Sequence, residues 1–340
     1  MRLKNKITLG NIILNYIIPA LFIIYNGKWV IGIEYVIVSF ILRWIFNLEL
    51  LLTGSKIKKD KIKLHSIQIS HFVEKIRWIL DMEEIEYEEE IDCGIIGVLF
   101  KGRTVPVLTI ENARTSIGNS TQILAFLSGT YPNSLILNHS GCFSSKQYNN
   151  KELENKKQEV IDLCKDFDKM GTAIQASMYG RLLGAHGFKI HRDTVLKLWG
   201  NDTNFTNLTP LWQRLLLQIT WPLLRLFVYY AFKLYDPDTI QRTDKLIYDM
   251  FAKVSSRISD GRRFLLGGDC PTLADITFCS ITGPLLLAPQ YGGFSRSKTL
   301  YEEVQNISDV IHFVDLHRNT PAGQWVLNMY SNHRPLRSAK

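Results

Sequence analysis

The sequence predicts an α/β domain followed by an all-α domain, with apolar helical segments in front of both. Three observations lead to this fold class. The first sixty residues contain two long apolar runs, residues 60–132 change between strand and helix periodicity, and residues 150–335 show only helical patterns. An apolar fraction of 46% in a chain of 340 residues is enough to form a sizeable core.

Segment 1–55 is predicted to be a membrane anchor of one or two transmembrane helices. Residues 7–25 are almost entirely apolar and long enough to cross a bilayer, while residues 29–52 are similar but carry charges such as Glu34 and Arg43. Basic residues on both flanks favour a hairpin whose ends, and the domains that follow, face the cytoplasm. The alternatives are one span followed by an interfacial helix, or a buried helical hairpin.

Charge and cysteine content restrict the function classes. The net charge of +8 is compatible with an anionic membrane or substrate. Nucleic acid is not predicted as a partner, because the chain has no zinc-finger spacing, RNP-like strand or basic helix. The five cysteines are widely spaced and include no C-x-x-C, which indicates a reducing compartment and no structural zinc or other metal.

The periodicity of residues 60–132 indicates alternating strands and helices. The first helix has an apolar face with Ile76 and Ile79, and a polar face with Glu74 and Lys75. The last helix is bounded by cap signals at its start and by Gly and Pro at its end. We expect strands at 62–68, 85–92, 104–110 and 113–118, and helices at 71–83 and 119–132.

Three motifs in this segment resemble the thioredoxin-like N-terminal domain of the glutathione S-transferase family. "SHFVEKIRWILDM" resembles the first-helix motif, "TVPVL" resembles the V-P-x-L that carries a cis-proline, and "GNSTQILAFL" resembles the motif that opens the third helix. They also occur in the family's order. The resemblance implies that residues 60–132 form a thioredoxin-like glutathione-binding domain, and that residues 150–335 form the all-helical C-terminal domain.

By this resemblance, Ser70 is the catalytic residue. A helix N-terminus stabilises an anion, and a hydroxyl there can donate a hydrogen bond to the glutathione sulfur and favour its thiolate. The alternative is that Ser70 is only a helix N-cap. His71 stands where many relatives carry proline, and is either a surface residue or a second donor.

The other two motifs are predicted to hold the rest of glutathione. The backbone at Val105–Pro106 would pair with its cysteinyl unit, unless Pro106 merely starts a strand. Ser120 would bind the γ-glutamyl carboxylate. Asn119 stands where many relatives have Glu or Gln, and it lacks the negative charge that would hold the γ-glutamyl ammonium group. Lys101 could meet the glycyl carboxylate or be a solvated loop residue. The candidate glutathione-binding residues are His71, Phe72, Lys101, Arg103, Thr104, Val105, Pro106, Asn119 and Ser120.

In the helical part, "KELENKKQEVIDLCKDFDKMGTAIQASMYGRLL" is predicted to be one long helix. In the resembled family this helix lines the electrophile pocket, which makes Gln175, Tyr179 and Arg181 candidates for that pocket, with core packing as the alternative for Tyr179. Thr272 and Asp275 fit a capping box, a folding motif without a catalytic role. A closing helix is expected at 319–334.

Residues 185–240 resemble an insertion into the helical domain. Residues 208–235 are apolar and aromatic nearly all round, but Pro222 and Arg225 disfavour a further transmembrane span. This segment is predicted to be an interfacial helix on the same membrane as the anchor, a buried helix or a dimer contact.

These expectations combine into a membrane-tethered glutathione transferase-like enzyme. It would stabilise the glutathione thiolate for attack on an apolar electrophile, with glutathione as co-substrate and with membrane lipid as a partner. The resemblance also implies a homodimer. The alternative is a non-catalytic membrane adaptor or binding protein of the same fold. A reductase or isomerase is disfavoured, because the hydroxyl of Ser70 cannot form a mixed disulfide.

Overall fold

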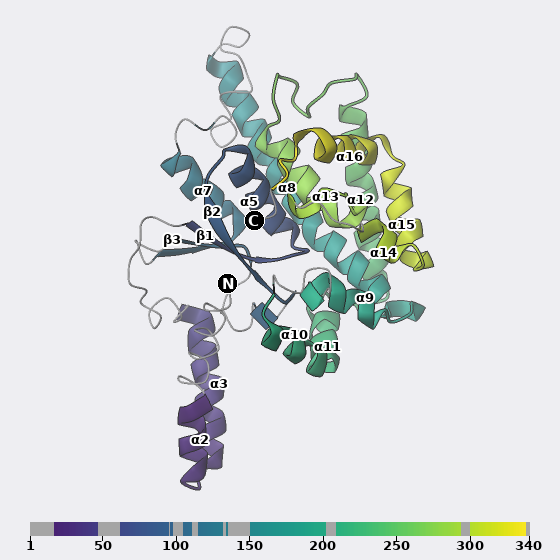
Figure 1. The fold of residues 1–340 in the computed structure, drawn as a ribbon. Coiled ribbons are helices and arrows are strands. Elements are labelled where there is room, and N and C mark those ends of the chain that lie inside the picture. Colours follow the sequence, from purple (N-terminus) through teal and green to yellow (C-terminus); the bar gives the residue numbers. More distant parts are fainter. Residues whose placement is uncertain are drawn as a thin grey trace.

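The chain forms a helical hairpin, a four-stranded α/β domain and a helical domain (Figure 1). The hairpin projects from one end of the molecule, and the sheet lies beside the helical domain. The computed structural model describes residues 17–46, 62–94, 96–97, 105–110, 115–131, 134, 150–201, 209–293 and 300–337.

The sheet has the thioredoxin-like strand order β2-β1-β3-β4. Strands β1 and β2 are parallel and are joined through a helix, whereas β3 is antiparallel to both β1 and β4. The predicted α/β fold is therefore confirmed. The strands are β1 (Ile62–Ile67), β2 (Tyr87–Asp92), β3 (Val107–Ile110) and β4 (Thr115–Gly118).

Helices α5 (His71–Met82) and α7 (Ser120–Thr130) of this domain lie close to their predicted positions. Apolar side chains of α5, including Ile76 and Ile79, are fully buried. Glu74 and Lys75 are buried as well, although the sequence places them on a polar face. Helices of the second domain pack against α5 and cover that face, and this contact cannot be read from the periodicity of α5.

The helical domain is organised around the long helix α8 (Asn150–Leu182), which packs against α12 (Asp238–Arg257) and α13 (Leu273–Leu286). One apolar core continues from the sheet and α5 into this domain, so the two domains share a core. η5 (Tyr291–Gly293) and α16 (Pro321–His333) contribute Tyr291 and Tyr330 to this core. A second core cluster includes residues of η2 (Ala185–Gly187), α9 (Arg192–Leu196), η3 (Lys197–Asn201), α14 (Leu300–Val304) and α15 (Ser308–Arg318).

The predicted caps in this domain are confirmed. The fully buried carboxylate of Asp275 accepts hydrogen bonds from the Thr272 N–H at 2.7 Å and its hydroxyl at 2.6 Å. It also accepts the N–H of Leu265 at 2.7 Å, which ties the preceding loop to the start of α13. The hydroxyl of Thr320 accepts the Gly323 N–H at 3.0 Å and caps α16.

The apolar segment 208–235 forms two helices, α10 (Leu211–Ile219) and α11 (Trp221–Ala231). The break lies at Thr220, which ends α10 and precedes α11, and Pro222 lies in the first turn of α11. Proline is accommodated there because the first N–H groups of a helix have no partner within it.

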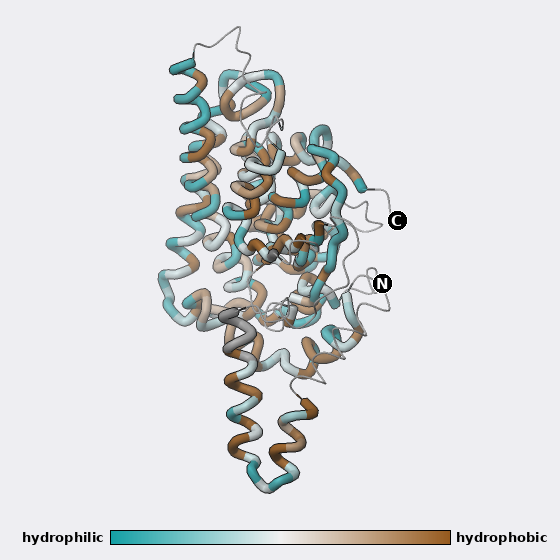
Figure 2. The backbone as a smooth tube through the Cα atoms, turned by 90° about the vertical axis from the view of Figure 1, so that its left-hand side faces the viewer, coloured by the Kyte–Doolittle hydropathy of each residue, from teal (hydrophilic) through white to brown (hydrophobic). Residues whose placement is uncertain are grey.

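The N-terminal hairpin consists of α2 (Ile18–Tyr25) and α3 (Trp29–Phe46), which pack against each other. Its turn is the predicted one at Asn26–Gly27, where the Asn26 amide donates to the Phe22 carbonyl at 2.7 Å. Figure 2 shows apolar segments along both helices, outside the body of the protein. The predicted runs 7–25 and 29–52 extend beyond the described residues. Within the parts of the chain that the structure describes, no helix is long and apolar enough to cross a membrane.

The cysteines depart from the expectation of a fully reduced chain. Cys93, Cys164 and Cys279 are free, and Cys93 and Cys279 are buried. Cys270, in the loop before α13, is disulfide-bonded. The wide spacing of the cysteines in the sequence gave no indication of this bond.

Candidate functional site

The strand pairing brings the three motifs singled out in the sequence to one edge of the sheet. His65 of β1 pairs with Val107 of β3, and Val107 pairs in turn with Gly118 of β4. Strands β1 and β4 therefore end at the edge where β3 begins. The turn to Ser70 follows β1, Val105–Pro106 precedes β3, and Asn119–Ser120 follows β4.

Ser70 is the N-cap of α5, in extended conformation, and its hydroxyl accepts the Val73 N–H at 3.4 Å. This confirms the capping interpretation of Ser70. The same hydroxyl still carries a proton that it can donate to a ligand, because a cap uses only the acceptor side of the oxygen. The side chain is half-buried. Its thiolate-stabilising role stays a prediction.

His71 is buried, with 2% of its surface exposed, so the prediction of a surface residue is wrong. Its ring packs against Phe72 and against α8, where an added Cβ on Gly171 would lie 2.6 Å from Nε2. Burial and the charge of Lys75 lower the pKa of His71 from 6.5 to about 3, so its ring is neutral. Nε2 is buried without a hydrogen-bond partner. The ring fits against α8 because residue 171 is a glycine. The periodicity of α5 alone could not predict this contact with a distant helix.

The peptide bond between Val105 and Pro106 is cis, as the resemblance predicts. Pro106 is buried and Val105 is half-buried. The carbonyl of Pro106 accepts the N–H of Asn119 at 3.2 Å, which joins the start of β3 to the start of α7.

Asn119 caps α7, accepting the Thr121 N–H on Oδ1 at 2.9 Å. Its φ of 70° and ψ of 129° lie outside the left-handed helical region that Asn tolerates, so the backbone is strained here. Strained residues of this kind often occur at functional sites. Ser120, the first residue of α7, is 4% exposed. The edge therefore combines the N-termini of α5 and α7, two places where backbone N–H groups and the helix dipole favour a bound anion.

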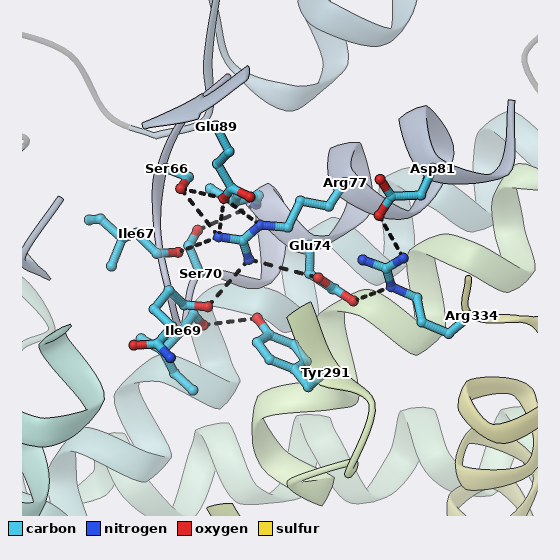
Figure 3. A network of polar contacts seen from close by, with 12 residues as sticks. Ser66, Ile67, Ile69, Ser70, Glu74, Arg77, Asp81, Glu89, Tyr291 and Arg334 are labelled. Carbon is cyan, nitrogen blue, oxygen red and sulfur yellow. Dashed lines mark hydrogen bonds and ion pairs between the residues drawn. The ribbon is translucent and has the colours of Figure 1, made fainter. Parts of the chain in front are cut away.

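A buried cluster of charges holds the turn that carries Ser70 (Figure 3). Arg77 of α5 is fully buried, pairs with Glu89 of β2 at 2.6 Å, and donates to the carbonyls of Ile67 at 3.4 Å and Gln68 at 3.3 Å. Burial opposes the charge of Arg77, but Glu89 and then Glu74 raise its pKa overall. Arg77 thus fixes the backbone between β1 and Ser70.

Two residues from the C-terminal third complete this support, and sequence reasoning missed both. Tyr291 donates its hydroxyl proton to the carbonyl of Ile69 at 3.0 Å, one residue before Ser70 (Figure 3). Arg334, in the tail after α16, pairs with Glu74 at 2.8 Å and with Asp81 at 2.8 Å. Both contacts join residues more than two hundred positions apart, so no local pattern could have found them.

The remaining candidate binding residues are placed as follows. Phe72 is half-buried beside His71, with Nζ of Lys75 5.8 Å from its ring centre. Lys75 pairs with Asp168 of α8 at 2.6 Å and is 1% exposed, so its charge is already used between the two domains. Three predicted residues lie outside the described part of the chain, namely Lys101, Arg103 and Thr104.

The predicted electrophile-pocket residues face different surroundings. Tyr179 accepts a hydrogen bond from Nε1 of Trp199 at 3.1 Å and packs against the second core cluster, in agreement with its core-packing alternative. Arg181 pairs with Asp244 of α12 at 2.6 Å, beside a cavity of about 760 Å³ between α8, α12 and α15. Gln175 is half-buried. Of these three side chains, only Arg181 lines this cavity. Their role in an electrophile pocket stays a prediction.

Comparison with known proteins agrees with the α/β domain. Residues 64–135 match the family model of the glutathione S-transferase N-terminal domain. No curated protein matches the chain. Among solved structures, a glutathione S-transferase of Rhodospirillum rubrum F11 is 16% identical, with 80% of this chain and 99% of that chain covered and a TM-score of 0.40. One of Ceriporiopsis subvermispora, in complex with glutathione, is 15% identical, with 82% and 100% covered and a TM-score of 0.45.

The β-etherase LigF of Sphingobium sp. strain SYK-6 is 16% identical, with 79% of this chain and 99% of that chain covered and a TM-score of 0.42. With TM-scores below 0.5, none of these three structures bears on the activity of the present chain. The strand order and the matched segment define the class of the domain. Residues 64–135 form a thioredoxin-like domain that is similar to a glutathione S-transferase N-terminal domain. In the described residues, no group of three or more His, Cys, Asp or Glu side chains could hold a metal ion.

Proposed function

We propose that the protein is a membrane-tethered glutathione transferase-like enzyme that acts on apolar electrophiles. The observation that supports this most is the meeting of Ser70, Val105–Pro106 and Asn119–Ser120 at one sheet edge, where α5 and α7 begin. Glutathione is an anionic tripeptide with a carboxylate at each end and a thiol between them. Two helix N-termini and an intervening backbone strand suit a ligand of that kind.

In the proposed mechanism, the γ-glutamyl carboxylate lies at the start of α7, against the N–H groups and the hydroxyl of Ser120. The cysteinyl unit pairs with the backbone beside Pro106, which directs the sulfur to the start of α5. There, the helix dipole and the Ser70 proton stabilise the thiolate. The thiolate attacks the electrophilic carbon of the second substrate, a carbon–sulfur bond forms, and the leaving group departs with its electron pair.

The test is the ultraviolet absorbance of bound thiolate as a function of pH, for the wild type and for Ser70→Ala. The proposal expects a thiol pKa below the ordinary value of about 8.5 in the wild-type complex. Ser70→Ala should raise this pKa and lower kcat/KM roughly 10- to 100-fold, the value of one hydrogen bond to a charged group. An unchanged thiol pKa in the variant would remove Ser70 from the chemistry.

A tether is supported by the hairpin of α2 and α3. Large apolar side chains are exposed on both helices, for example Phe22 at 69%, Trp29 at 62% and Leu21 at 59%. Water does not solvate such a surface favourably, and a bilayer does. Removing residues 1–55 should abolish sedimentation with vesicles, and a truncated chain that still sediments would contradict a tether at this site.

We further propose that the folded domains face the cytoplasm, as the basic flanks of the apolar runs predict. The disulfide at Cys270 opposes this orientation, because such bonds are typical of oxidising compartments. Protease digestion of sealed membrane vesicles of known sidedness decides between the two. Digestion of the folded domains from the cytoplasmic side supports the proposal, and protection from that side contradicts it.

A non-catalytic adaptor of the same fold is the second candidate, and Asn119 is the residue that favours it. This exposed side chain uses its oxygen as the cap of α7 and carries no charge for the ammonium of glutathione. An adaptor would bind glutathione weakly or not at all. Asn119→Glu should then raise the affinity for glutathione in an enzyme with an intact site and have no effect in an adaptor without one.

A further inference from the structure

Helices α10 and α11 carry apolar side chains on two opposite faces. One face is buried in the second core cluster and includes Leu217, Trp221, Leu224 and Val228. The other face is exposed and runs the length of both helices. We define the α10–α11 stripe as these exposed residues: Leu211, Leu215, Ile219, Leu223, Leu226, Phe227 and Tyr230.

The stripe is unusually exposed for side chains of this kind. Ile219 is 76% exposed, Leu223 is 69% exposed and Leu211 is 62% exposed. The spacing of four residues places Leu211, Leu215 and Ile219 along one face of α10. Leu223, Leu226, Phe227 and Tyr230 are exposed on α11, which follows after Thr220. Contiguous apolar surface of this type marks an interaction site rather than ordinary surface.

The charged residues of the two helices have one sign. α10 and α11 contain Arg214 and Arg225, and no Asp or Glu. The turn after α11 contains Lys233 and also Asp236, whose carboxylate pairs with Arg242. Arg225 donates from Nε to the carbonyl of Leu183 at 3.1 Å, while Lys233 is exposed just after α11. Cationic and tyrosine side chains beside an apolar face are the composition of helices that lie in the interface of anionic membranes. A twofold contact with a second copy would instead place like charges against each other.

The position of the stripe agrees with this composition. α10 and α11 lie at the end of the molecule from which the hairpin of α2 and α3 projects (Figure 1). α10 is also fixed to the sheet, since Gln213 donates from Nε2 to Asp92 at 2.7 Å and accepts the N–H of Cys93 at 2.7 Å. Asp92 ends β2, the strand parallel to β1, so α10 is attached at the sheet edge that holds the candidate site.

We propose that the α10–α11 stripe is a second membrane-contacting surface, which lies in the headgroup region of the anionic bilayer that the hairpin contacts. This inference rests on the membrane attachment proposed above. Hairpin and stripe together orient the protein, so that the sheet edge with Ser70 and Ser120 faces the bilayer surface. Apolar electrophiles dissolved in the bilayer would then reach the site without crossing water.

The test uses the full-length chain with an environment-sensitive fluorophore on one introduced cysteine. Ile219→Cys probes the stripe, Leu21→Cys probes the hairpin, and Leu316→Cys, on the exposed face of α15, is the matched control. Burial raises the pKa of Cys93 to about 12 and that of Cys164 to about 11, and it also raises the pKa of Cys279, so these three thiols react slowly. The labelled wild type provides the background signal of the native cysteines. Vesicles of phosphatidylcholine with and without phosphatidylserine are then added.

The proposal expects blue-shifted emission at Ile219 and Leu21 with phosphatidylserine vesicles, and no shift at Leu316. A shift at Leu21 without one at Ile219 would overturn the stripe as a membrane surface and leave the tether intact. No shift at either position would overturn both proposals. A shift at Ile219 that grows with protein concentration, without vesicles, would identify a second copy as the occupant and also overturn the inference.

Substitutions in the stripe give a second, independent readout. Leu215→Glu and Leu223→Glu should each weaken binding to phosphatidylserine vesicles about tenfold or more, the value of one leucine returned to water. Leu316→Glu should leave vesicle binding unchanged. Circular dichroism of each variant checks the fold, and folded stripe variants with wild-type vesicle affinity would contradict the proposal.

Discussion

Nε of Arg334 donates to Oε1 of Glu74 at 2.8 Å, and both side chains are completely buried. Arg334 lies in the C-terminal tail, and Glu74 lies one turn after Ser70 in α5. Glu74 and Asp81 together raise the pKa of Arg334 despite its burial. The tail therefore closes on the helix that begins the candidate site, and it holds that helix by charge pairing.

Removing this arginine should destabilise the protein strongly. Arg334→Met leaves the buried carboxylate of Glu74 with only Arg77 at 3.8 Å, and breaking a buried pair typically costs about 3–5 kcal/mol. Urea unfolding followed by circular dichroism measures the loss. Lys165→Met is the control, because its pair with Asp162 is exposed and screened by water. Equal midpoints for Arg334→Met and the wild type would show that the pair does not hold the tail.

Gly171 of α8 is predicted to be essential for the packing of His71. An added Cβ would lie 2.6 Å from Nε2 of His71 and 3.2 Å from Cζ of Phe72, so Gly171→Ala should lower the free energy of unfolding by roughly 1–3 kcal/mol. The matched control is Gly129→Ala in α7, where nothing lies within 4 Å of the added atom. That variant should be neutral or gain up to about 1 kcal/mol from helix propensity. Similar stabilities of the two variants would contradict the described packing.

The neutral, buried ring of His71 predicts acid sensitivity. Its pKa falls from 6.5 to about 3 on folding, so the unfolded chain binds the proton more tightly. This contribution to stability is complete above pH 6.5 and is lost as the pH falls toward 3, at up to about 1.4 kcal/mol per pH unit.

His71→Gln, which cannot be protonated, should show a shallower fall in the free energy of unfolding between pH 6.5 and pH 5. Burial also lowers the pKa of His317 and His333, so part of the slope should remain in the variant. Urea titrations at several pH values provide the comparison. A slope equal to that of the wild type would mean that His71 is not neutral in the folded protein.

Asp275 is expected to matter for folding and not for chemistry. Asp275→Asn weakens the hydrogen bonds to Leu265 and Thr272, with a cost of about 2 kcal/mol or more. The rate per folded molecule should equal that of the wild type, since Asp275 lies inside the start of α13. A lower kcat/KM at full folding would refute its purely structural role.

Much of the α/β domain could be predicted from local patterns. Alternation and caps indicated each strand and helix between 62 and 130, and the V-P motif indicated the cis bond before Pro106. These features depend on residues adjacent in the chain, which is why the sequence was sufficient. The break between α10 and α11 at Thr220 was harder to predict, because residues 208–235 are apolar on both sides of it.

Contacts between distant segments could not be predicted. The sequence indicated a polar face on α5, but Glu74 and Lys75 are buried because Arg334 and Asp168 arrive from elsewhere in the chain. Of the two interpretations of His71, that of a surface residue is wrong for the same reason. Such burial depends on how the two domains pack. The sequence of one helix does not show which distant segments will pack against it.

The central claim is that the sheet edge at Ser70 and Ser120 binds glutathione. Calorimetric titration of the full-length protein with glutathione tests it most directly, using wild type, Ser120→Ala and, as a control away from the edge, Ser259→Ala. We predict one site in the wild type and in Ser259→Ala, and roughly tenfold or greater weakening in Ser120→Ala from the loss of one hydrogen bond to a carboxylate. No binding to the wild type, or equal affinity in all three proteins, would contradict the account.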